Sequence, residues 1–432
     1  MFLFKNSLPN SIYSQTRLQQ MPQIAVKASG YNILERPANF HQRVLELIAS
    51  AKVRIMMTML YLQDDEAGRE VMEALYEAKR RNPKLYIRVY VDFHRAQRGL
   101  IGATGDSRTN ADMYRDFAQD QELAPHVYGV PVKRREIFGV MHLKGFVFDD
   151  TVLYSGASIN NVYVNYANQK YRLDRYHEIQ SKELANSFCR FTNEVFHINY
   201  AVQDFSQGNI RPAKEMKNEI KMLQRSLTKA QYTVKAARKL QDDEVGITPL
   251  SGLSKKNNQL NRSIIWALDS ARKHIFICTP YFNPPKELLE HLEMALERNV
   301  EITIVVGDKV ANDFYISPDK PFSPIGAIPY VYEQNLKEMV QRHKHHIDAG
   351  KLNIHLWKDG INTYHLKGMF IDRNLAVITG NNLNPRAWAL DLENGLFIND
   401  PNHLLSEKFM HEKQYILHHT TKITSVDQLD SF

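Results

Sequence analysis

The sequence predicts an α/β protein made of two similar halves, each a mixed β-sheet flanked by helices. Two observations carry this prediction. Apolar runs rich in β-branched residues alternate with amphipathic segments, and the whole pattern occurs twice. The composition, 43% hydrophobic and 24% charged over 432 residues, is that of a folded protein and excludes a disordered chain. We expect the halves to be related by pseudo-two-fold symmetry, with an active site between them.

The repeat begins with a helix end followed by a strand. Residues 48–62 read IASAKVRIMMTMLYL, and residues 268–282 read LDSARKHIFICTPYF, with Ser, Ala and Tyr in the same register. A second apolar run follows in each half, at residues 85–92 and 300–308. Long apolar runs separated by helical segments indicate strands that are covered on both faces. This pattern therefore predicts, in each half, a sheet packed between helices.

The domain boundaries follow from this repeat. We expect an N-terminal half over residues 1–205, a basic helical linker over 206–245 and a C-terminal half over 246–432. Residues 211–240 hold nine Lys or Arg and two Glu, with apolar residues three and four apart, which predicts an amphipathic helix. Its apolar stripe would pack on the core while its basic face is either merely solvated or placed against anionic lipid.

A block of polar residues occurs once in each half and indicates the chemistry. Each copy reads His-x-Lys, four further residues, Asp, and then a Gly and an Asn. Residues i and i+2 of a strand share a face, so His and Lys project together, and the Asp begins a turn. The returning strand brings the Asn back beside the His. The candidate catalytic residues are His142, Lys144, Asp149 and Asn160 in the first copy and His365, Lys367, Asp372 and Asn384 in the second.

These blocks resemble the paired HKD motifs of the phospholipase D superfamily. The stretches VDFHRAQRG (91–99), CTPYFN (278–283), GDKVANDFYI (307–316) and ITGNNLNPRAW (378–388) are similar to the bacterial type I phosphatidylserine synthases. The resemblance implies transfer of a phosphatidyl group from CDP-diacylglycerol to L-serine, with release of CMP. Other enzymes of the superfamily, a cardiolipin synthase or a phospholipase D, remain alternatives, and a nuclease is a more distant one.

The resemblance also implies the roles of the motif residues. His142 would attack phosphorus and form a phosphatidyl-histidine, and His365 would act as acid and base. Lys144 and Lys367 would neutralise the phosphate oxygens, and the two Asn would add donors. Asp149 and Asp372, as turn residues, could equally be structural.

Superfamily members use a downstream carboxylate to hold the second ring nitrogen of a catalytic histidine. Asp174 and Glu393 occupy matching positions, each five residues before an isoleucine of the following strand. We therefore predict them as the pair that orients the histidines. Glu178 is out of register and is not predicted to serve this role.

Substrate contacts are expected where strands end. Arg95 and Arg98 follow the second strand of the first half, where an arginine fork could bind a diphosphate, although a solvated loop is an equal alternative. Asn312, Asp313 and Tyr315 follow the corresponding strand of the second half. Tyr281 and Asn283, in the family-like stretch CTPYFN, complete the predicted set.

The sequence predicts no cofactor and no metal. The histidines lack metal-ligand spacing, and no glycine-rich phosphate loop is present. The net charge of +7 suggests an anionic partner, and no recognisable nucleic-acid-binding module is present, so we expect no specific nucleic acid. No apolar run reaches the length of a spanning helix. We expect a cytoplasmic protein that associates peripherally with the anionic inner face of the cell membrane, with its oligomeric state left open.

Overall fold

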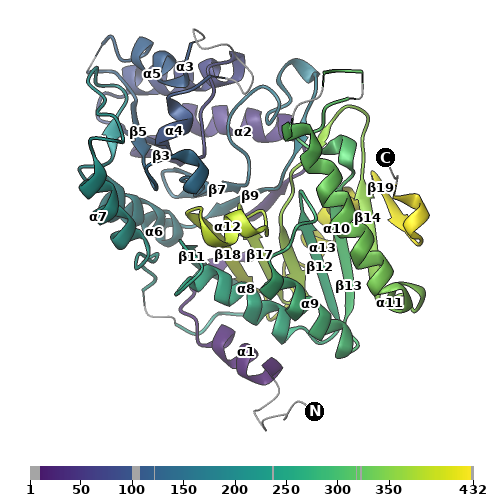
Figure 1. The fold of residues 1–432 in the computed structure, drawn as a ribbon. Coiled ribbons are helices and arrows are strands. Elements are labelled where there is room, and N and C mark those ends of the chain that lie inside the picture. Colours follow the sequence, from purple (N-terminus) through teal and green to yellow (C-terminus); the bar gives the residue numbers. More distant parts are fainter. Residues whose placement is uncertain are drawn as a thin grey trace.

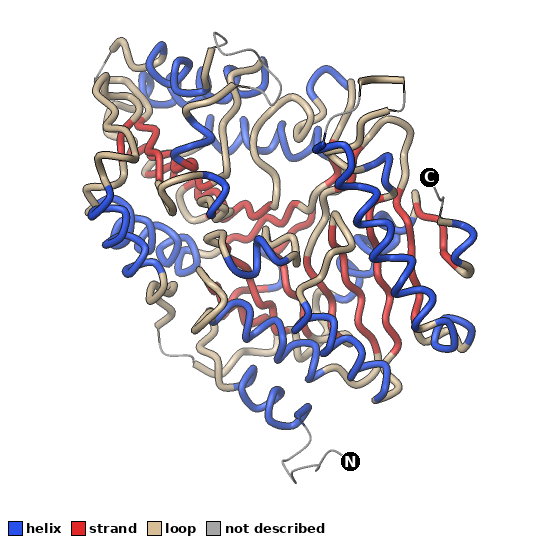
Figure 2. The backbone as a smooth tube through the Cα atoms, viewed as in Figure 1, coloured by secondary structure: helices blue, strands red, loops and turns tan. Residues whose placement is uncertain are grey.

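A computed structural model describes residues 10–99, 108–120, 122–235, 238–317, 319–321 and 324–429. Two mixed sheets lie side by side, each with helices packed on its faces (Figure 1 and Figure 2). This confirms the predicted α/β architecture with two similar halves.

The first sheet has the strand order β10-β5-β4-β3-β6-β7-β9-β2. Its centre is parallel from β3 to β5, and antiparallel from β3 through β6 and β7 to β9. The strands are β2 (Tyr31–Leu34), β3 (Arg54–Thr58), β4 (Tyr86–Asp92), β5 (His126–Val130), β6 (Gly145–Phe148), β7 (Thr151–Ser155), β9 (Tyr176–Gln180) and β10 (Gln203–Asp204). Its helices include α2 (Pro37–Ser50), α3 (Glu66–Arg81), the short α4 (Phe93–Ala96) and α5 (Asn110–Asp116), and α6 (Lys182–Thr192).

The second sheet repeats this pattern in the order β1-β11-β18-β17-β16-β12-β13-β14-β19. Its strands are β1 (Ile24–Lys27), β11 (Glu244–Gly252), β12 (His274–Thr279), β13 (Glu301–Gly307), β14 (Leu352–Trp357), β16 (Gly368–Ile371), β17 (Leu375–Thr379), β18 (Glu393–Asn399) and β19 (Thr420–Ile423). Its helices include α8 (Gln259–Ser270), α9 (Lys286–Glu297), α10 (Ile328–Arg342), α11 (Lys344–Asp348), α12 (Pro385–Ala389) and α13 (Ser406–Leu417). Helices α8, α9 and α10 cover its near face in Figure 1.

The boundary predicted for the first half is wrong at its N-terminal end. Helix α1 (Asn10–Gln19) packs against α8, and β1 pairs antiparallel with β11, with Ile24 opposite Ile247. Residues 10–27 therefore belong to the second sheet. Every residue of β11 is buried, so this strand needs a partner on both edges. A four-residue strand carries no sequence signal for which sheet edge it joins.

The linker helix is shorter than predicted. Helix α7 spans Lys217–Leu227, where the sequence pattern predicted residues 211–240. Beyond the helix the chain enters the core, where Tyr232 stacks on Phe191 and its hydroxyl accepts a hydrogen bond from Nδ2 of Asn394 (2.8 Å). Ala237, one of the predicted stripe residues, lies outside the described residues. The apolar side chains Ile220, Leu223 and Leu227 of α7 are buried, as the predicted stripe requires.

Two further features concern the chain as a whole. The strands β8 (Arg172–Leu173) and β15 (Thr363–Tyr364) pair in parallel across the seam between the halves.

Among the described residues, no helix combines the length and the apolar character that crossing a membrane requires.

Candidate active site

Backbone hydrogen bonds across the seam place both histidines. The amide of His142 donates to the carbonyl of Leu392 (2.9 Å), and the amide of His365 donates to the carbonyl of Leu173 (2.8 Å). Leu392 and Leu173 are each followed directly by one of the predicted carboxylates, Glu393 and Asp174. Each half therefore delivers its carboxylate to the histidine of the other half.

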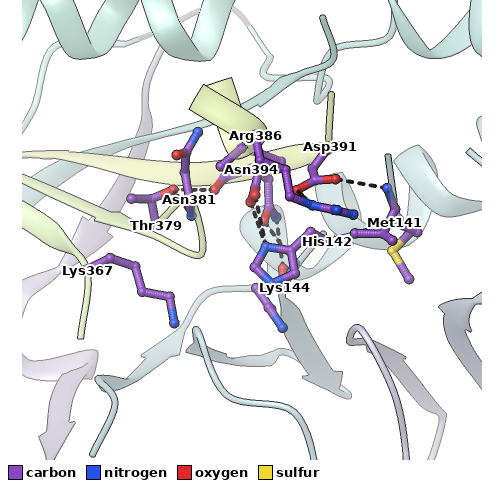
Figure 3. A network of polar contacts seen from close by, with 12 residues as sticks. Met141, His142, Lys144, Lys367, Thr379, Asn381, Arg386, Asp391 and Asn394 are labelled. Carbon is purple, nitrogen blue, oxygen red and sulfur yellow. Dashed lines mark hydrogen bonds and ion pairs between the residues drawn. The ribbon is translucent and has the colours of Figure 1, made fainter. Parts of the chain in front are cut away.

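His142 is held by groups from the second half. Its Nδ1 lies 2.9 and 3.0 Å from the two carboxylate oxygens of Glu393. Asn394, next in sequence, accepts from the amide of Lys144 (2.9 Å) and donates to its carbonyl (2.8 Å). Figure 3 shows Asn394 and Asp391 around the His142 ring. With an acceptor on Nδ1, a neutral ring carries its proton there and leaves the Nε2 lone pair free.

His365 has a different environment. Its Nδ1 lies 2.6 Å from Nζ of Lys367, 3.0 Å from the hydroxyl of Tyr163 and 3.3 Å from Oδ2 of Asp174. Lys367 can donate, Asp174 can accept and the hydroxyl can do either. Either tautomer of His365 therefore finds a partner at Nδ1, which suits a ring that gains and loses a proton at Nε2.

Burial favours the neutral form of both rings. Burial and the two lysines, Lys144 first, lower the pKa of His142 well below its usual value. Burial and Lys367 lower the pKa of His365 to about 4. Burial alone would raise the pKa of Asp174, but Lys367 and His365 lower it to about 2, so this carboxylate stays ionised. Burial, reinforced by Asp391, raises the pKa of Glu393.

The two lysines differ as the histidines do. Lys367 Nζ lies 2.6 Å from Oδ2 of Asp174, whereas Lys144 Nζ has, among the described residues, only the hydroxyl of Ser158 as a side-chain hydrogen-bond partner, at 3.4 Å. Burial, together with the charge of Lys367, lowers the pKa of Lys144 to about 7. A bound phosphate would supply the anion that Lys144 lacks.

The glycines of the two motifs make room for these lysines. A Cβ atom on Gly156 would lie 2.5 Å from Nζ of Lys367, and one on Gly380 would lie 2.6 Å from Cγ of Lys144. Each glycine admits the lysine of the opposite half. The sequence pattern placed the glycines beside the site but gave no reason to pair them with that lysine.

The side chains of Asn160 and Asn384 are held in fixed orientations. The Oδ1 of Asn160 accepts from the amide of Tyr163 (2.8 Å), and the Oδ1 of Asn384 accepts from the amide of Ala387 (2.9 Å) and caps α12. Both side chains are buried. Because each Oδ1 is occupied, each Nδ2 is oriented as a donor.

Asp149 and Asp372 lie away from the histidines and bind backbone. Strand β6 separates Asp149 from Lys144, a length of about 13 Å. Asp149 accepts from the amides of Lys52, Val53 and Arg54 at 2.8–3.0 Å. Asp372 accepts in the same way from the amides of residues 272–274. Both have positive φ (51° and 50°), a conformation that Asp tolerates. Their geometry therefore indicates a structural role, in place of the predicted catalytic one.

A cavity of about 430 Å³ opens beside the site. Four of the predicted substrate residues line it, namely Arg95, Arg98, Asp313 and Tyr315. Tyr281 donates its hydroxyl to Oδ2 of Asp313 (3.1 Å). Asn283 instead accepts from Nδ2 of Asn335 in α10 (3.3 Å), whereas Asn312 accepts from the amide of Phe314 in its own loop (2.9 Å).

Two residues at the site were not predicted from the sequence. Arg172 lines the cavity, with Nε 3.0 Å from Oδ1 of Asp313. Its position two residues before Asp174 was the available signal, because such residues share a strand face. Tyr163 contacts His365 but has no counterpart in the second motif that would have marked it. Among the described residues, no group of three or more His, Cys, Asp or Glu side chains is placed to hold a metal ion.

Comparisons with known proteins agree with this geometry. Residues 44–204 and 264–419 match the family model described as cardiolipin synthase, PLD-like domain. The chain is 44% identical over 421 residues to the CDP-diacylglycerol–serine O-phosphatidyltransferase of Haemophilus influenzae, covering 96% of this chain and 92% of that one. It is 43% identical over 418 residues to the Escherichia coli K12 enzyme with the same activity name, with the same coverage. The crystal structure of phosphatidylserine synthase from H. influenzae superposes with a TM-score of 0.93 at 42% identity, covering 98% of this chain and 94% of that chain.

Proposed function

This chain belongs to the phosphatidylserine synthase family of the phospholipase D superfamily, and we propose that it transfers a phosphatidyl group from CDP-diacylglycerol to L-serine, giving phosphatidylserine and CMP. The observation that carries this proposal is the crossed arrangement of the site. Two histidine–lysine pairs meet at the seam, and each ring is held by the carboxylate of the other half. One site thus contains a nucleophile, an acid–base group and a charge clamp.

The first step forms a covalent intermediate. Nε2 of His142 attacks the phosphatidyl phosphorus, a nitrogen–phosphorus bond forms, and the bond from phosphorus to the CMP oxygen breaks. The ring of the phosphohistidine is positively charged, because Nδ1 keeps its proton and donates it in a hydrogen bond to Glu393. Lys144, Lys367 and the Nδ2 groups of the two Asn stabilise charge on the phosphate oxygens. The neutral tautomer of His365 that carries its proton on Nε2 donates a hydrogen bond to the leaving phosphate, which is weakly basic and departs without a full proton transfer.

The second step transfers the phosphatidyl group to serine. The serine hydroxyl attacks phosphorus, its proton passes to Nε2 of His365, and the bond to His142 breaks. On taking this proton His365 becomes an imidazolium, whose Nδ1–H donates to Asp174. Two in-line displacements retain the configuration at phosphorus. The lysines supply the positive charge, so we expect no metal requirement in the chemical steps.

Asp313 is placed to recognise the acceptor. Its Oδ2 lies 3.9 Å from Nε2 of His365, and its other oxygen is held by Arg172. Hydrogen bonds of about 2.8 Å would let an acceptor hydroxyl reach His365 while an ammonium on the adjacent carbon reaches Asp313. L-serine has that arrangement. The guanidinium groups of Arg95, Arg98 and Arg172 line the same cavity and are available for the diphosphate and the serine carboxylate.

The lipid substrate places the reaction at a membrane surface. We propose that the protein works in the cytoplasm on the anionic inner face of the cell membrane. Support comes from α7, whose Lys217, Lys221 and Arg225 are exposed, together with Lys229 just after the helix, while its apolar stripe is buried in the core. Such a basic face attracts anionic headgroups at low salt.

The test is direct. Protein mixed with CDP-diacylglycerol and labelled L-serine should yield labelled phosphatidylserine and CMP. His142→Ala and His365→Ala should both abolish turnover with the fold intact. The phosphate of CMP is only weakly basic, with a pKa of about 6, so it can leave without a proton from His365. His365→Ala should therefore still accumulate a phosphatidyl group on His142, detectable by mass spectrometry. Inversion at a chiral phosphorus, or a covalent adduct on His365 in the wild type, would contradict the mechanism.

A further inference from the structure

A turn at the seam exposes apolar side chains to solvent. The 3₁₀ turn η2 (Glu136–Phe138) presents Ile137 and Phe138, which are 67% and 55% exposed. The preceding residues Arg134 and Arg135 are also exposed. Together with Lys133 they place three cations and two large apolar side chains within six residues. We call residues 133–138 the tip.

The tip is held rigidly, so its exposed side chains are not those of a loose loop. The Glu136 carboxylate binds Arg98 (2.8 Å) and Arg95 (3.5 Å) of the first half. Its carbonyl accepts from Arg386 of the second half (2.9 Å). Gly139 follows at φ 139° so close to Leu390 that a Cβ would lie 2.2 Å from the Leu390 carbonyl oxygen. Both halves therefore fix the tip in place.

The tip lies at the rim of the substrate cavity. Arg95 and Arg98, which bind Glu136, also line that cavity. His142 follows Phe138 by only four residues, and the segment between them is pinned by Asp391, which accepts from the amide of Val140 (3.0 Å). Whatever surface the tip contacts is therefore brought to the mouth of the active site.

We propose that the tip is the membrane anchor of the protein: Ile137 and Phe138 enter the acyl region of a lipid surface, and Arg134 and Arg135 contact its anionic headgroups. This inference rests on the proposed function, which requires a lipid substrate to reach His142. The arrangement of adjacent cationic and large apolar side chains matches the boundary between headgroups and acyl chains. Glu136 sits between them but is neutralised by Arg95 and Arg98. The anchor would set the cavity mouth at headgroup level.

The tip and the basic face of α7 predict different salt dependence. The apolar stripe of α7 is buried, so α7 can contribute only electrostatic attraction, which salt screens. Insertion of Ile137 and Phe138 persists at high salt. In the double variant Ile137→Ser/Phe138→Ser, binding to mixed phosphatidylcholine–phosphatidylglycerol vesicles should weaken about 100-fold at high salt. The α7 variant with Lys217, Lys221, Arg225 and Lys229 changed to Gln serves as the matched control and should weaken binding only at low salt.

Activity assays separate this inference from the proposed function. With CDP-diacylglycerol in vesicles, the tip variant should lose activity in parallel with binding. With a short-chain, monomerically dissolved CDP-diacylglycerol, it should match the wild type. A wild type that makes no phosphatidylserine from the soluble substrate refutes the proposed function, while equal vesicle binding by tip variant and wild type refutes the anchor.

A fluorescence experiment tests insertion without removing both side chains. The native Cys189 and Cys278 are buried, so Phe138→Cys can be labelled selectively with a polarity-sensitive fluorophore. Its emission should shift to shorter wavelength on vesicles and be quenched by brominated acyl chains. The control label at Met222→Cys, on an exposed position of α7, should show neither effect. Quenching at position 222 but not at 138 would overturn the proposal.

Discussion

Glu393 binds Nδ1 of His142 at 2.9 Å although the two residues are 251 positions apart, whereas the carboxylate nearer in sequence, Asp174, binds His365. This crossing makes the site asymmetric in chemistry while its scaffold is symmetric. Nδ1 of His142 contacts the carboxylate of Glu393. Nδ1 of His365 contacts a carboxylate, an ammonium and a hydroxyl. The asymmetry supports His142 as the nucleophile and His365 as the acid–base residue.

Glu393→Gln should slow formation of the phosphatidyl-histidine by roughly 10²–10⁴-fold. A glutamine amide can donate to Nδ1 and so place the ring proton on Nε2, which removes the nucleophilic lone pair. The burst of CMP released from CDP-diacylglycerol in the absence of serine measures this step. Glu178→Gln is the control, because Glu178 binds Arg43 away from the site. Equal bursts in the Glu393 variant and the wild type would refute the role of Glu393.

Gly156→Ala and Gly380→Ala should each lower turnover about 100-fold while the protein remains folded. The new methyl group would displace the buried lysine of the opposite half, and small displacements of a charge clamp are costly. Gly208→Ala is the matched control, since a Cβ there meets nothing within 4 Å. Steady-state rates and melting temperatures of the three variants check the expectation. Normal turnover in both motif variants would mean that the lysines tolerate the shift.

The pH dependence of kcat/KM for soluble CDP-diacylglycerol should report Lys144. This parameter follows the free enzyme, in which the pKa of Lys144 is lowered to about 7. The protonated form binds the diphosphate, so kcat/KM should be flat at mildly acidic pH and fall as pH rises above about 7. The pKa values of both histidines are lowered, so they add no ascending limb near neutrality. In the Lys144→Arg variant, the kcat/KM that remains should no longer fall as the pH rises above about 7. A profile that rises between pH 6 and 7 would instead indicate deprotonation of a histidine.

Asp149→Asn should lower the free energy of unfolding by about 2 kcal/mol and leave the kinetics of both substrates within about twofold. The variant loses a charged acceptor for three backbone amides that hold the start of β3. Its neighbour Asp150 is exposed and ion-paired only with Arg54 (3.3 Å), so Asp150→Asn should change stability little. Denaturant unfolding and steady-state kinetics distinguish the outcomes. Loss of activity in Asp149→Asn at unchanged stability would restore the catalytic interpretation.

Asp313→Asn should reduce the preference for L-serine over 3-hydroxypropanoate, which lacks the ammonium, by about 10- to 100-fold. The preference for L-serine over ethanolamine should change far less, because both acceptors carry the ammonium. Ratios of kcat/KM for the three acceptors measure both effects within one protein preparation. Asp313→Glu retains the charge and should keep most of the preference for serine. If both ratios fall together, Asp313 acts by holding Arg172 and not by binding the acceptor.

Much of the fold and site could be predicted from the sequence because the chain repeats itself. The strands before each motif, and the placement of His and Lys on one strand face, follow from local periodicity. The limits of α7 and the sheet joined by β1 could not be predicted, since the chain after α7 follows a core contact of Tyr232 with a distant residue and β1 pairs with a strand more than 200 residues away. Arg172 and Tyr163 were missed because neither belongs to the repeated pattern.

The sequence by itself determined which polar side chains the repeated motifs supply: two histidines, two lysines, two asparagines and two carboxylates in matched register. Only the tertiary structure decided their partnerships. Glu393 serves His142, Gly156 admits Lys367, and Asp149 binds backbone at the far end of its strand. The physical reason is that residue type and spacing fix what a segment can do and which face it presents. The packing of the two sheets at the seam selects which distant group lies opposite each motif side chain. Hydrogen bonds such as that from the His142 amide to the Leu392 carbonyl hold this packing.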